Sequence, residues 1–311
     1  MRIILSRKGM DSGNTGKDAD GRKTRGIPSP IFRNDGRMVS LPIGDGRCCM
    51  DDLCFESLNL GRMVEDLSNG RLSSRMDVHR DPDLYRGLIA RPRNWRPAFG
   101  QATGDVTHLE DNGVGIGDLF LFFGWFREVE RVRISGIWKW QYVRGAPDLH
   151  VIFGWLQVGD IVRLPDKDEE KSDKEIWDAA RRKYPWLTQH DHFRKTDVKK
   201  NAIYVSTEHL KLGPRVSKIQ GGGAFSRFSS DLQLTSPDAE GRSVWMLPSC
   251  FWSKKRPDGR ISRHEDPKRW KRNGDGVILR SVARGQEFVV DSDRCPGVED
   301  WALALIKNNA G

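Results

Sequence analysis

The hydrophobic residues of this chain occur mostly in short runs separated by polar and glycine-containing segments, a pattern typical of many short strands and few helices. The longest run covers residues 119–126, and a similar run follows about thirty positions later at residues 149–156. Both runs contain Phe-Gly-Trp followed by a large apolar residue. We expect the two segments to pair as strands of one sheet, with the glycine marking a bulge or a bend.

Other segments carry the signals of shorter elements. Asn34-Asp35-Gly36 lies between apolar runs and predicts a hairpin turn, because glycine tolerates a positive φ there. Residues 50–75 have apolar positions at helical spacing and end near Asn69-Gly70. Further strands are expected at residues 3–5, 38–43, 202–206, 243–247, 277–279 and 287–290, and helices at residues 175–184 and 298–307.

These elements predict an α+β fold centred on a curled mixed or antiparallel sheet with peripheral helices. The core of the sheet is expected at about residues 114–164. Residues 9–26 and 221–223 are glycine-rich and are expected to be loops, and a charged segment at residues 166–174 separates the core from the next helix. Since no clean linker is present, we expect one integrated domain over residues 1–311.

The composition describes a globular protein with a basic surface. Hydrophobic residues make up 37% and charged residues 31% of the chain, which argues against disorder. The formal net charge is +9 at pH 7. Such a field attracts polyanions, so a nucleotide or nucleic acid is an expected partner. A basic surface without an anionic partner is the alternative.

Cysteine use and hydropathy bear on location. The five cysteines are odd in number and contain no C-x-x-C pair, which argues against a disulfide framework. The longest apolar run is far shorter than the roughly 20 residues of a membrane-spanning helix, and the first residues lack the apolar region of a signal peptide. We expect a cytoplasmic protein without a membrane partner. Nothing in the sequence indicates its oligomeric state.

The seven histidines are the main indication of chemistry. Several stand beside carboxylates or another histidine, and imidazole together with carboxylate suits a borderline divalent metal. We favour Fe²⁺, with Zn²⁺ or Mn²⁺ as alternatives. Hydrogen-bonded or surface histidines are the competing interpretation. The expected metal ligands are His79, Asp81, His108, His150, His190 and His192.

Two short segments present such side chains in alternation. In an extended chain His79, Asp81 and Asp83 point to one side, and Pro82 favours an extended Asp81. Positions 190 and 192 alternate in the same way. Asp83 and His264 are the expected catalytic acid–base groups.

A second set of residues suits phosphate. The segment at residues 6–9 follows a strand and opens a glycine-rich loop, so it could present backbone N–H groups and cations to a phosphate, although it is not a Walker motif. A solvated basic turn and a strand-edge salt bridge are the alternatives. The expected substrate- or phosphate-binding residues are Ser6, Arg7, Lys8, Asp11, Arg284 and Gln286.

Basic and aromatic residues also alternate in places. Residues 91–96 and 131–142 could stack bases on tryptophan while arginines meet phosphates. The alternation of Trp138, Trp140 and Tyr142 equally fits the buried side of a strand, and we expect at least one of these tryptophans in the core. Residues 252–256 and 268–272 continue the pattern, for which a solvated basic face is the alternative.

Several motifs in this sequence resemble those of the nucleotide modification associated domain 3 family. They run nearly from end to end of the chain: residues 3–9 with 11–12, 26–30, 79 with 81–84, 99–101, 108–109, 117–126, 150–156 and 284–289. The resemblance implies a role in making modified nucleotides or bases, and it implies no particular catalytic residue. Residues 14–25 depart from the first motif as an insertion. Residues 117–123 and 151–158 also resemble strands of PUA-like barrels, which implies a PUA-like barrel core.

Together these observations predict a metal-dependent enzyme, of oxygenase or hydrolase type, that modifies a nucleotide or a base in nucleic acid. The alternative is a non-enzymatic PUA-like module that binds modified bases in DNA or RNA, in a pocket lined by Trp125 or Trp155. A third possibility is an enzyme that acts on a different anionic small molecule.

Overall fold

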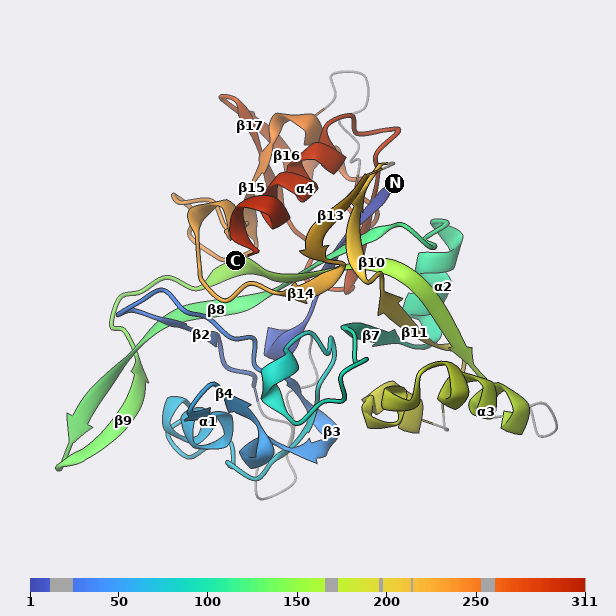
Figure 1. Ribbon diagram of the computed structural model, residues 1–311. Coiled ribbons are helices and arrows are strands. Elements are labelled where there is room, and N and C mark those ends of the chain that lie inside the picture. The colour runs from blue at the N-terminus through green and yellow to red at the C-terminus, as the bar shows by residue number, and fades with distance from the viewer. Residues whose placement is uncertain (12–24, 166–172, 196–197, 214, 253–260, 311) are drawn as a thin grey trace.

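Figure 1 shows a computed structural model of the protein, which describes residues 1–11, 25–165, 173–195, 198–213, 215–252 and 261–310. The α-helices within these ranges are α1 (Leu60–Leu67), α2 (Thr103–Asp111), α3 (Asp173–Lys183) and α4 (Val298–Asn309). The strands are β1 (Arg2–Arg7), β2 (Ser29–Phe32), β3 (Ile43–Cys49), β4 (Cys54–Phe55), β5 (Leu58–Asn59), β6 (Asp77–His79), β7 (Ala98–Gln101), β8 (Leu119–Ile134), β9 (Ile137–Tyr142), β10 (Leu149–Leu164), β11 (Asn201–Ser206), β12 (His209–Leu212), β13 (Arg215–Gln220), β14 (Gly222–Ala224), β15 (Val244–Pro248), β16 (Trp270–Asn273), β17 (Gly276–Arg280) and β18 (Glu287–Asp291).

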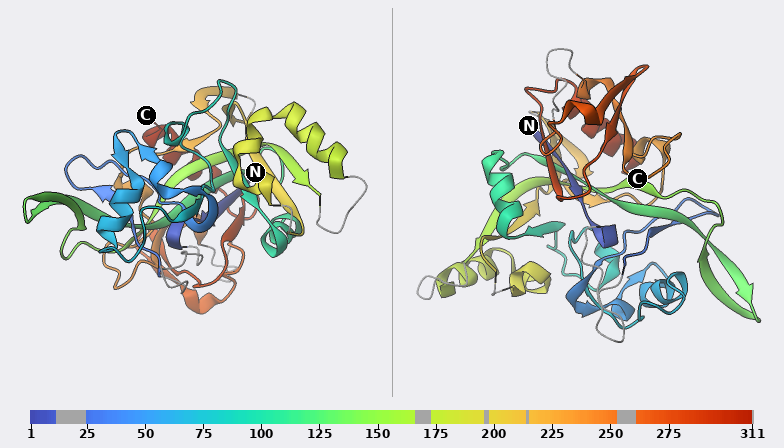
Figure 2. Two further views of the ribbon diagram at one scale, coloured as in Figure 1. Left: turned by 90° about the horizontal axis from the view of Figure 1, so that it is seen from below. Right: turned by 180° about the vertical axis from the view of Figure 1, so that it is seen from behind.

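A nine-stranded sheet forms the centre of the described part of the chain. Its main path is β18-β1-β8-β10-β11-β7, while β2 and β9 pair with β8, and β14 pairs with β10. β1 and β2 run parallel to β8, and the other pairs are antiparallel, so the sheet is mixed. Figures 1 and 2 show β15–β17 and α4 on one side of this sheet, and α1 with β3 and β4 on the other.

The two Phe-Gly-Trp segments pair in this sheet, which confirms the prediction from their sequences. β8 and β10 are antiparallel, and their register shifts between Ile152 and Gly154, which marks a bulge. A Cβ added at Gly154 would lie 2.8 Å from the carbonyl oxygen of Gly223 and 2.4 Å from Leu84 Cδ1. The glycine is therefore required where β14 and the Leu84 side chain approach β10.

Residues 50–75 differ from the continuous helix that their spacing predicts. Only Leu60–Leu67 is α-helical, and the β4–β5 hairpin precedes it. Glu56 in that hairpin has a φ of 53°, a left-handed conformation that an α-helix cannot contain. The apolar spacing still has a function, because α1 buries Met63 and Val64 in a second hydrophobic cluster.

The remaining expected elements agree with the structure, with two exceptions. The seven strands and helices expected at residues 3–5, 175–184, 202–206, 243–247, 277–279, 287–290 and 298–307 correspond to β1, α3, β11, β15, β17, β18 and α4. The strand expected at 38–43 is wrong, because Met38 forms only an isolated bridge to Ile31 and β3 begins at Ile43. The expected loop at 221–223 contains part of β14, which pairs with β10. Most of the expected loop at 9–26, of the charged segment at 166–174 and of the basic run at 252–256 lies outside the described residues.

The central sheet is open rather than closed into a barrel. β18 and β7 lie at opposite ends of the strand path, and no pairing among the described residues joins them. The α+β class with a mixed sheet is therefore confirmed, whereas a PUA-like barrel core is not. No disulfide bond joins any of the five cysteines within the described ranges of the chain. None of the helices in the described ranges combines the length and the apolar character needed to cross a membrane.

Candidate metal centre

Two segments far apart in the sequence meet beside β7. The first runs from β6 to Asp81, and the second is the 3-10 helix Asp191–Arg194. The backbone N–H of Arg80 donates to the Asp191 carboxylate at 2.8 Å, and the Arg80 guanidinium donates to the carbonyl oxygen of Gln189 at 2.7 Å. These buried, charge-assisted bonds hold the two segments against each other and bring their side chains together.

His79, Asp81 and His192 form the cluster that the two segments create. Each offers one ligand atom, and these atoms lie within 4.8 Å of one another. The three side chains are buried, with exposed fractions of 4%, 7% and 3%. His79 Nε2 is buried and has no hydrogen-bond partner among the residues that the structure describes. A buried polar atom without a partner is unfavourable, and a bound cation would compensate for it.

The imidazole of His192 is held in one orientation and one tautomer. Asn201 Nδ2 donates to the carbonyl oxygens of His192 and Lys195, at 2.8 and 3.1 Å, which directs Asn201 Oδ1 toward His192 Nδ1 at 2.8 Å. Nδ1 therefore carries the proton, and the Nε2 lone pair faces the cluster. Gly100 provides the space, because a Cβ there would lie 2.2 Å from His192 Cγ. This is how metal-binding histidines are commonly oriented.

Asp81 and His190 are arranged in a similar way. Asp81 Oδ1 accepts the backbone N–H of Gly100 at 2.7 Å, and Oδ2 lies 3.6 Å from His192 Nε2. His190 Nδ1 accepts the backbone N–H of His192 at 3.2 Å, so its proton is on Nε2, which lies 3.6 Å from Asp81 Oδ1. Oδ2 is thus the oxygen that faces the cluster, while Gly100 and His190 flank Oδ1.

Burial sets the protonation of these groups. Burial raises the pKa of Asp81 to about 7, although the nearby Lys8 ammonium and the Gly100 hydrogen bond oppose that rise. Burial also lowers the pKa of His190 to about 3, and it lowers the pKa of His79 and of His192 well below the ordinary value, with the Lys195 ammonium acting in the same direction. The imidazoles are therefore neutral at pH 7, which is the form that binds a metal.

The three side chains fit a divalent transition metal. Two imidazoles and one carboxylate leave coordination positions open for other ligands. This set occurs in non-haem iron sites and also in catalytic zinc sites. Bonds of about 2.1 Å place ligand atoms roughly 3–3.4 Å apart, so the 3.6 Å between Asp81 and His192 needs little adjustment. Lys195 Nζ lies 3.5 Å from His192 Nε2, so the ammonium would have to withdraw as an ion binds.

Asp83 lies outside this cluster. It forms an ion pair with Arg91 in which both side chains are buried, and Arg91 Nη1 also lies 3.5 Å from Gln189 Oε1. Burial raises the pKa of Asp83, and the charge of Arg91 opposes the rise. Of the three alternating residues, His79 and Asp81 therefore lie together in the cluster, whereas Asp83 pairs with Arg91.

His150 belongs to a different buried group. Trp245 Nε1 donates to His150 Nδ1 at 2.9 Å, and His150 Nε2 donates to Asp11 Oδ2 at 2.7 Å. Asp11 also accepts from Arg242 at 2.8 Å. Burial favours a higher pKa for Asp11, but the hydrogen bonds from His150 and Arg242 outweigh it and lower that pKa. Both ring nitrogens of His150 are thus already engaged.

His108 and His264 are engaged elsewhere. His108 Nε2 lies 3.0 Å from Ser262 Oγ. His264 Nε2 accepts the backbone N–H of Val282 at 3.2 Å, and Nδ1 lies 3.0 Å from the carbonyl oxygen of Ser262. Burial lowers the pKa of His264 to about 4. The structure does not bring these two histidines to the cluster of His79.

The expected phosphate-binding cations, Arg7 and Lys8, are buried rather than exposed. Arg7 ends β1 and Lys8 follows it, and the two residues are only 6% and 5% exposed. Arg7 donates to the carbonyl oxygens of Val282 and Ala283 at 2.7 and 2.9 Å. Lys8 Nζ forms an ion pair with Glu287 at 2.8 Å. Both cations therefore have internal partners.

The other residues of that expected group lie in varied environments. Ser6 is fully buried, and its hydroxyl has no hydrogen-bond partner among the described residues. Gln286 accepts from Lys8 at 3.0 Å. Arg284 is exposed. The structure therefore does not gather the six expected phosphate-binding residues into one open site.

The tryptophans considered for base stacking are placed differently from one another. Trp138 is 56% exposed, whereas Trp140 is half-buried and packs against the second hydrophobic cluster, so the expectation of a tryptophan in the core is met only in part. Trp155 is buried, its indole N–H donates to the carbonyl oxygen of Gln220 at 3.1 Å, and its ring packs on Phe225. Trp155 is therefore a packing residue rather than an open stacking surface.

Two residues that support the cluster were not predicted from the sequence. Gly100 and Asn201 belong to β7 and β11, and their contact with His192 depends on the pairing of those strands. The Phe-Gly-Gln motif at residues 99–101 was noticed only as part of the family resemblance. No local pattern marks Asn201.

The arrangement defines a class of site, a buried two-histidine, one-carboxylate candidate metal centre in an α+β protein. The chain belongs to the nucleotide modification associated domain 3 family, whose model matches residues 2–291. This confirms the resemblance noted in the sequence. No match was found among curated proteins or among solved structures.

Proposed function

We propose that the protein is a metal-dependent enzyme that modifies a nucleotide or a base in nucleic acid. Two observations support this proposal. The first is its membership of a family associated with nucleotide modification. The second, which carries the chemistry, is the cluster of His79, Asp81 and His192, in which a buried imidazole nitrogen has no partner in the described part of the chain.

Fe²⁺ is the ion that we propose for this site, because two imidazoles and one carboxylate are the ligand set of non-haem iron enzymes. When bound, such an ion supplies a Lewis acid with open positions for water, dioxygen or substrate. With Fe²⁺ the reaction class is oxygenase, whereas Zn²⁺ or Mn²⁺ at the same residues favours a hydrolytic reaction.

The protein side chains have separate roles in this proposal. His79 Nε2, His192 Nε2 and Asp81 Oδ2 hold the ion. Asn201 keeps the His192 tautomer, and His190 with Gly100 flanks the second oxygen of Asp81. The burial of the site excludes bulk water, which strengthens these interactions.

Metal content measured by elemental analysis, on protein purified without added metal, tests the proposal. We expect about one equivalent of a transition metal in the wild type, its loss in His192→Ala, and its retention in His108→Ala. The second variant is the matched control, because His108 lies outside the cluster. A metal-free wild type that also fails to take up Fe²⁺, Zn²⁺ or Mn²⁺ would reject the site.

The reaction itself is tested by mass spectrometry of nucleosides from cells with and without the protein. A new nucleoside that appears with the wild type and not with His192→Ala supports the proposal. Unchanged nucleosides in DNA, RNA and the nucleotide pool would exclude the proposed activity in that host.

A further inference from the structure

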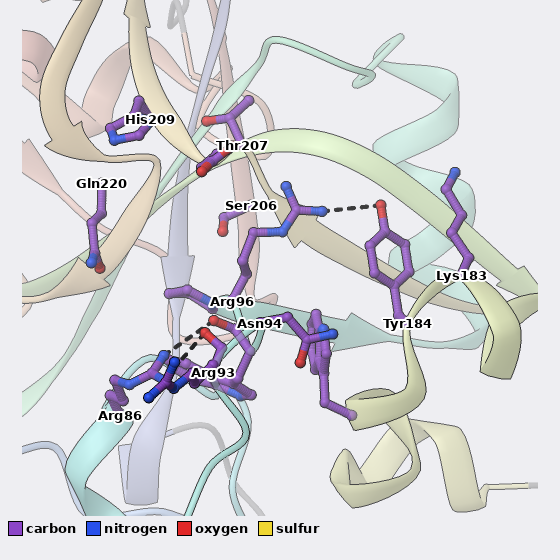
Figure 3. Close-up of a pocket in the computed structure, with 14 residues that line it drawn as sticks. Arg86, Arg93, Asn94, Arg96, Lys183, Tyr184, Ser206, Thr207, His209 and Gln220 are labelled. Atoms are coloured by element: carbon purple, nitrogen blue, oxygen red, sulfur yellow. Dashed lines mark hydrogen bonds between the residues drawn. The ribbon is translucent and has the colours of Figure 1, made fainter.

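A cavity of about 470 Å³ lies beside the loop that joins β6 to β7. Figure 3 shows its lining, with Arg86 and Arg93 on one side, Tyr184 and Lys183 on another, and Ser206 and Thr207 between them. The volume is within the range of small-molecule sites, roughly 300–1,000 Å³. We call it the arginine pocket.

The lining of the arginine pocket is strongly cationic. It contains Arg86, Arg93, Arg96 and Lys183, against a single carboxylate, Glu208. Lys183 is neutralised by Asp160 at 2.6 Å outside the lining. The three arginines form no salt bridge within the described ranges of the chain. Their charge is therefore available to an anion.

The arginines are held in place without being neutralised. Arg86 donates to the carbonyl oxygens of Pro92, Arg93 and Trp95 at 3.0 to 3.3 Å. Arg96 Nη2 donates to the Tyr184 hydroxyl at 3.1 Å, which in turn donates to Asp160 at 2.9 Å. A guanidinium has five N–H donors, so each of these side chains retains donors for a ligand. Preordered guanidinium groups of this kind suit phosphate.

Two buried polar atoms in the lining have no hydrogen-bond partner within the described ranges. They are Ser206 Oγ and Trp95 Nε1, on side chains that are 0% and 5% exposed. Both are hydrogen-bond donors, and buried donors normally have an acceptor. Their position in the lining of a cationic cavity points to an acceptor-rich ligand, such as a phosphate or a base.

The arginine pocket and the candidate metal centre are built from the same segments. Residues 86–97 connect Asp81 to Gly100, residues 183–186 precede His190, and Ser206 ends the strand that starts at Asn201. Arg91 belongs to the same loop: it pairs with Asp83, and its guanidinium lies 4.9 Å from the centre of the Trp95 ring. A ligand in the pocket would thus contact the same segments that carry the metal ligands.

We propose that the arginine pocket binds a phosphate group of the substrate, either of a free nucleotide or of a nucleic-acid strand. This inference rests on the proposed function, which makes the substrate a nucleotide or nucleic acid. It goes further because it assigns a phosphate-bearing substrate rather than a free base. The pocket takes the role that the sequence suggested for Arg7 and Lys8.

Fluorescence anisotropy of a labelled single-stranded oligothymidylate, with thymidine monophosphate, thymidine and inorganic phosphate as competitors, tests this proposal. We expect Arg93→Glu to weaken binding at least tenfold and to lower the salt slope by about 0.7 per lost phosphate contact. Arg272→Glu, which changes the same charge at an exposed position of β16, serves as the control. Arg96→Gln is the second pocket variant, and thermal unfolding checks that each variant is folded.

The competitors distinguish the two sources of phosphate. Equal affinity for the monophosphate and the oligonucleotide supports a free nucleotide, and much tighter oligonucleotide binding supports a strand. Binding that thymidine displaces as well as its monophosphate does, or that Arg93→Glu and Arg272→Glu weaken equally, overturns the proposal. His192→Ala is expected to bind the probe like the wild type. Phosphate binding in the pocket can thus be tested independently of the metal. If the wild type binds no metal but still binds the probe through Arg93, the proposed enzyme is rejected and the pocket is not.

Discussion

Gly100→Ala is the substitution that tests the construction of the candidate metal centre most sharply. Gly100 is in β7, and its φ is not in the left-handed region, so alanine brings no backbone strain there. The added Cβ would lie 2.2 Å from Cγ, 2.4 Å from Cδ2 and 2.7 Å from Cβ of His192. These distances are far below van der Waals contact, and the imidazole must move.

The expected effect has two parts. Overpacking of a buried site typically costs about 1–3 kcal/mol of unfolding free energy. Displacement of His192 also breaks its 2.8 Å bond to Asn201, and loss of such a supporting contact typically weakens metal affinity about 10–100-fold. We therefore expect Gly100→Ala to remain folded, with a lower Tm and at least tenfold weaker Fe²⁺ or Zn²⁺ binding.

Gly104→Ala is the matched control, because a Cβ at Gly104 meets no atom within 4 Å. Gly104 lies in α2, where alanine is favoured by up to about 1 kcal/mol. Metal titration followed by calorimetry, with urea unfolding of the same samples, measures both effects. A folded Gly100→Ala that binds metal as tightly as Gly104→Ala would refute the proposed packing of His192.

Three further predictions concern the buried polar groups. Asn201→Ala should weaken metal binding about 10–100-fold because the His192 tautomer is no longer fixed, and a metal titration measures this. His264 is neutral in the fold with a pKa of about 4, below its ordinary 6.5, so its stabilisation is full above pH 6.5 and is lost as the pH falls to 4. Between pH 6.5 and 4 the free energy of unfolding, measured with urea, should fall by about 3 kcal/mol less in His264→Gln than in the wild type. An equal fall in the two proteins would contradict this prediction. Lys8→Met should destabilise by about 3–5 kcal/mol because Glu287 is left uncompensated, and the Glu287→Gln double variant should recover much of this loss.

The sequence predicted the elements whose signals are local. The Phe-Gly-Trp runs pair as β8 and β10, because each is a long apolar segment that is buried when it lies inside a sheet. The apolar spacing of residues 50–75 predicts one helix, because that spacing does not reveal the positive φ of Glu56. In this chain the pattern of apolar residues therefore identifies the long strands, but it does not locate the ends of α1.

The candidate site could be predicted only in part, for a topological reason. The alternation of His79 with Asp81 is visible in the sequence, but the choice of His192 over His150 depends on long-range strand pairing. Arg7 and Lys8 look like surface cations, yet β1 pairs with the distant strands β8 and β18, and both side chains are buried against partners from residues 282–287. No local sequence pattern predicts which distant strands pair with β1 in the sheet.

X-ray absorption spectroscopy at the edge of the bound metal tests the central claim most directly. The account predicts two imidazole nitrogens and a carboxylate oxygen at about 2.0–2.2 Å in the wild type, and one imidazole fewer in His192→Ala. An identical imidazole count in the two proteins, or a metal bound only through sulfur, would contradict it.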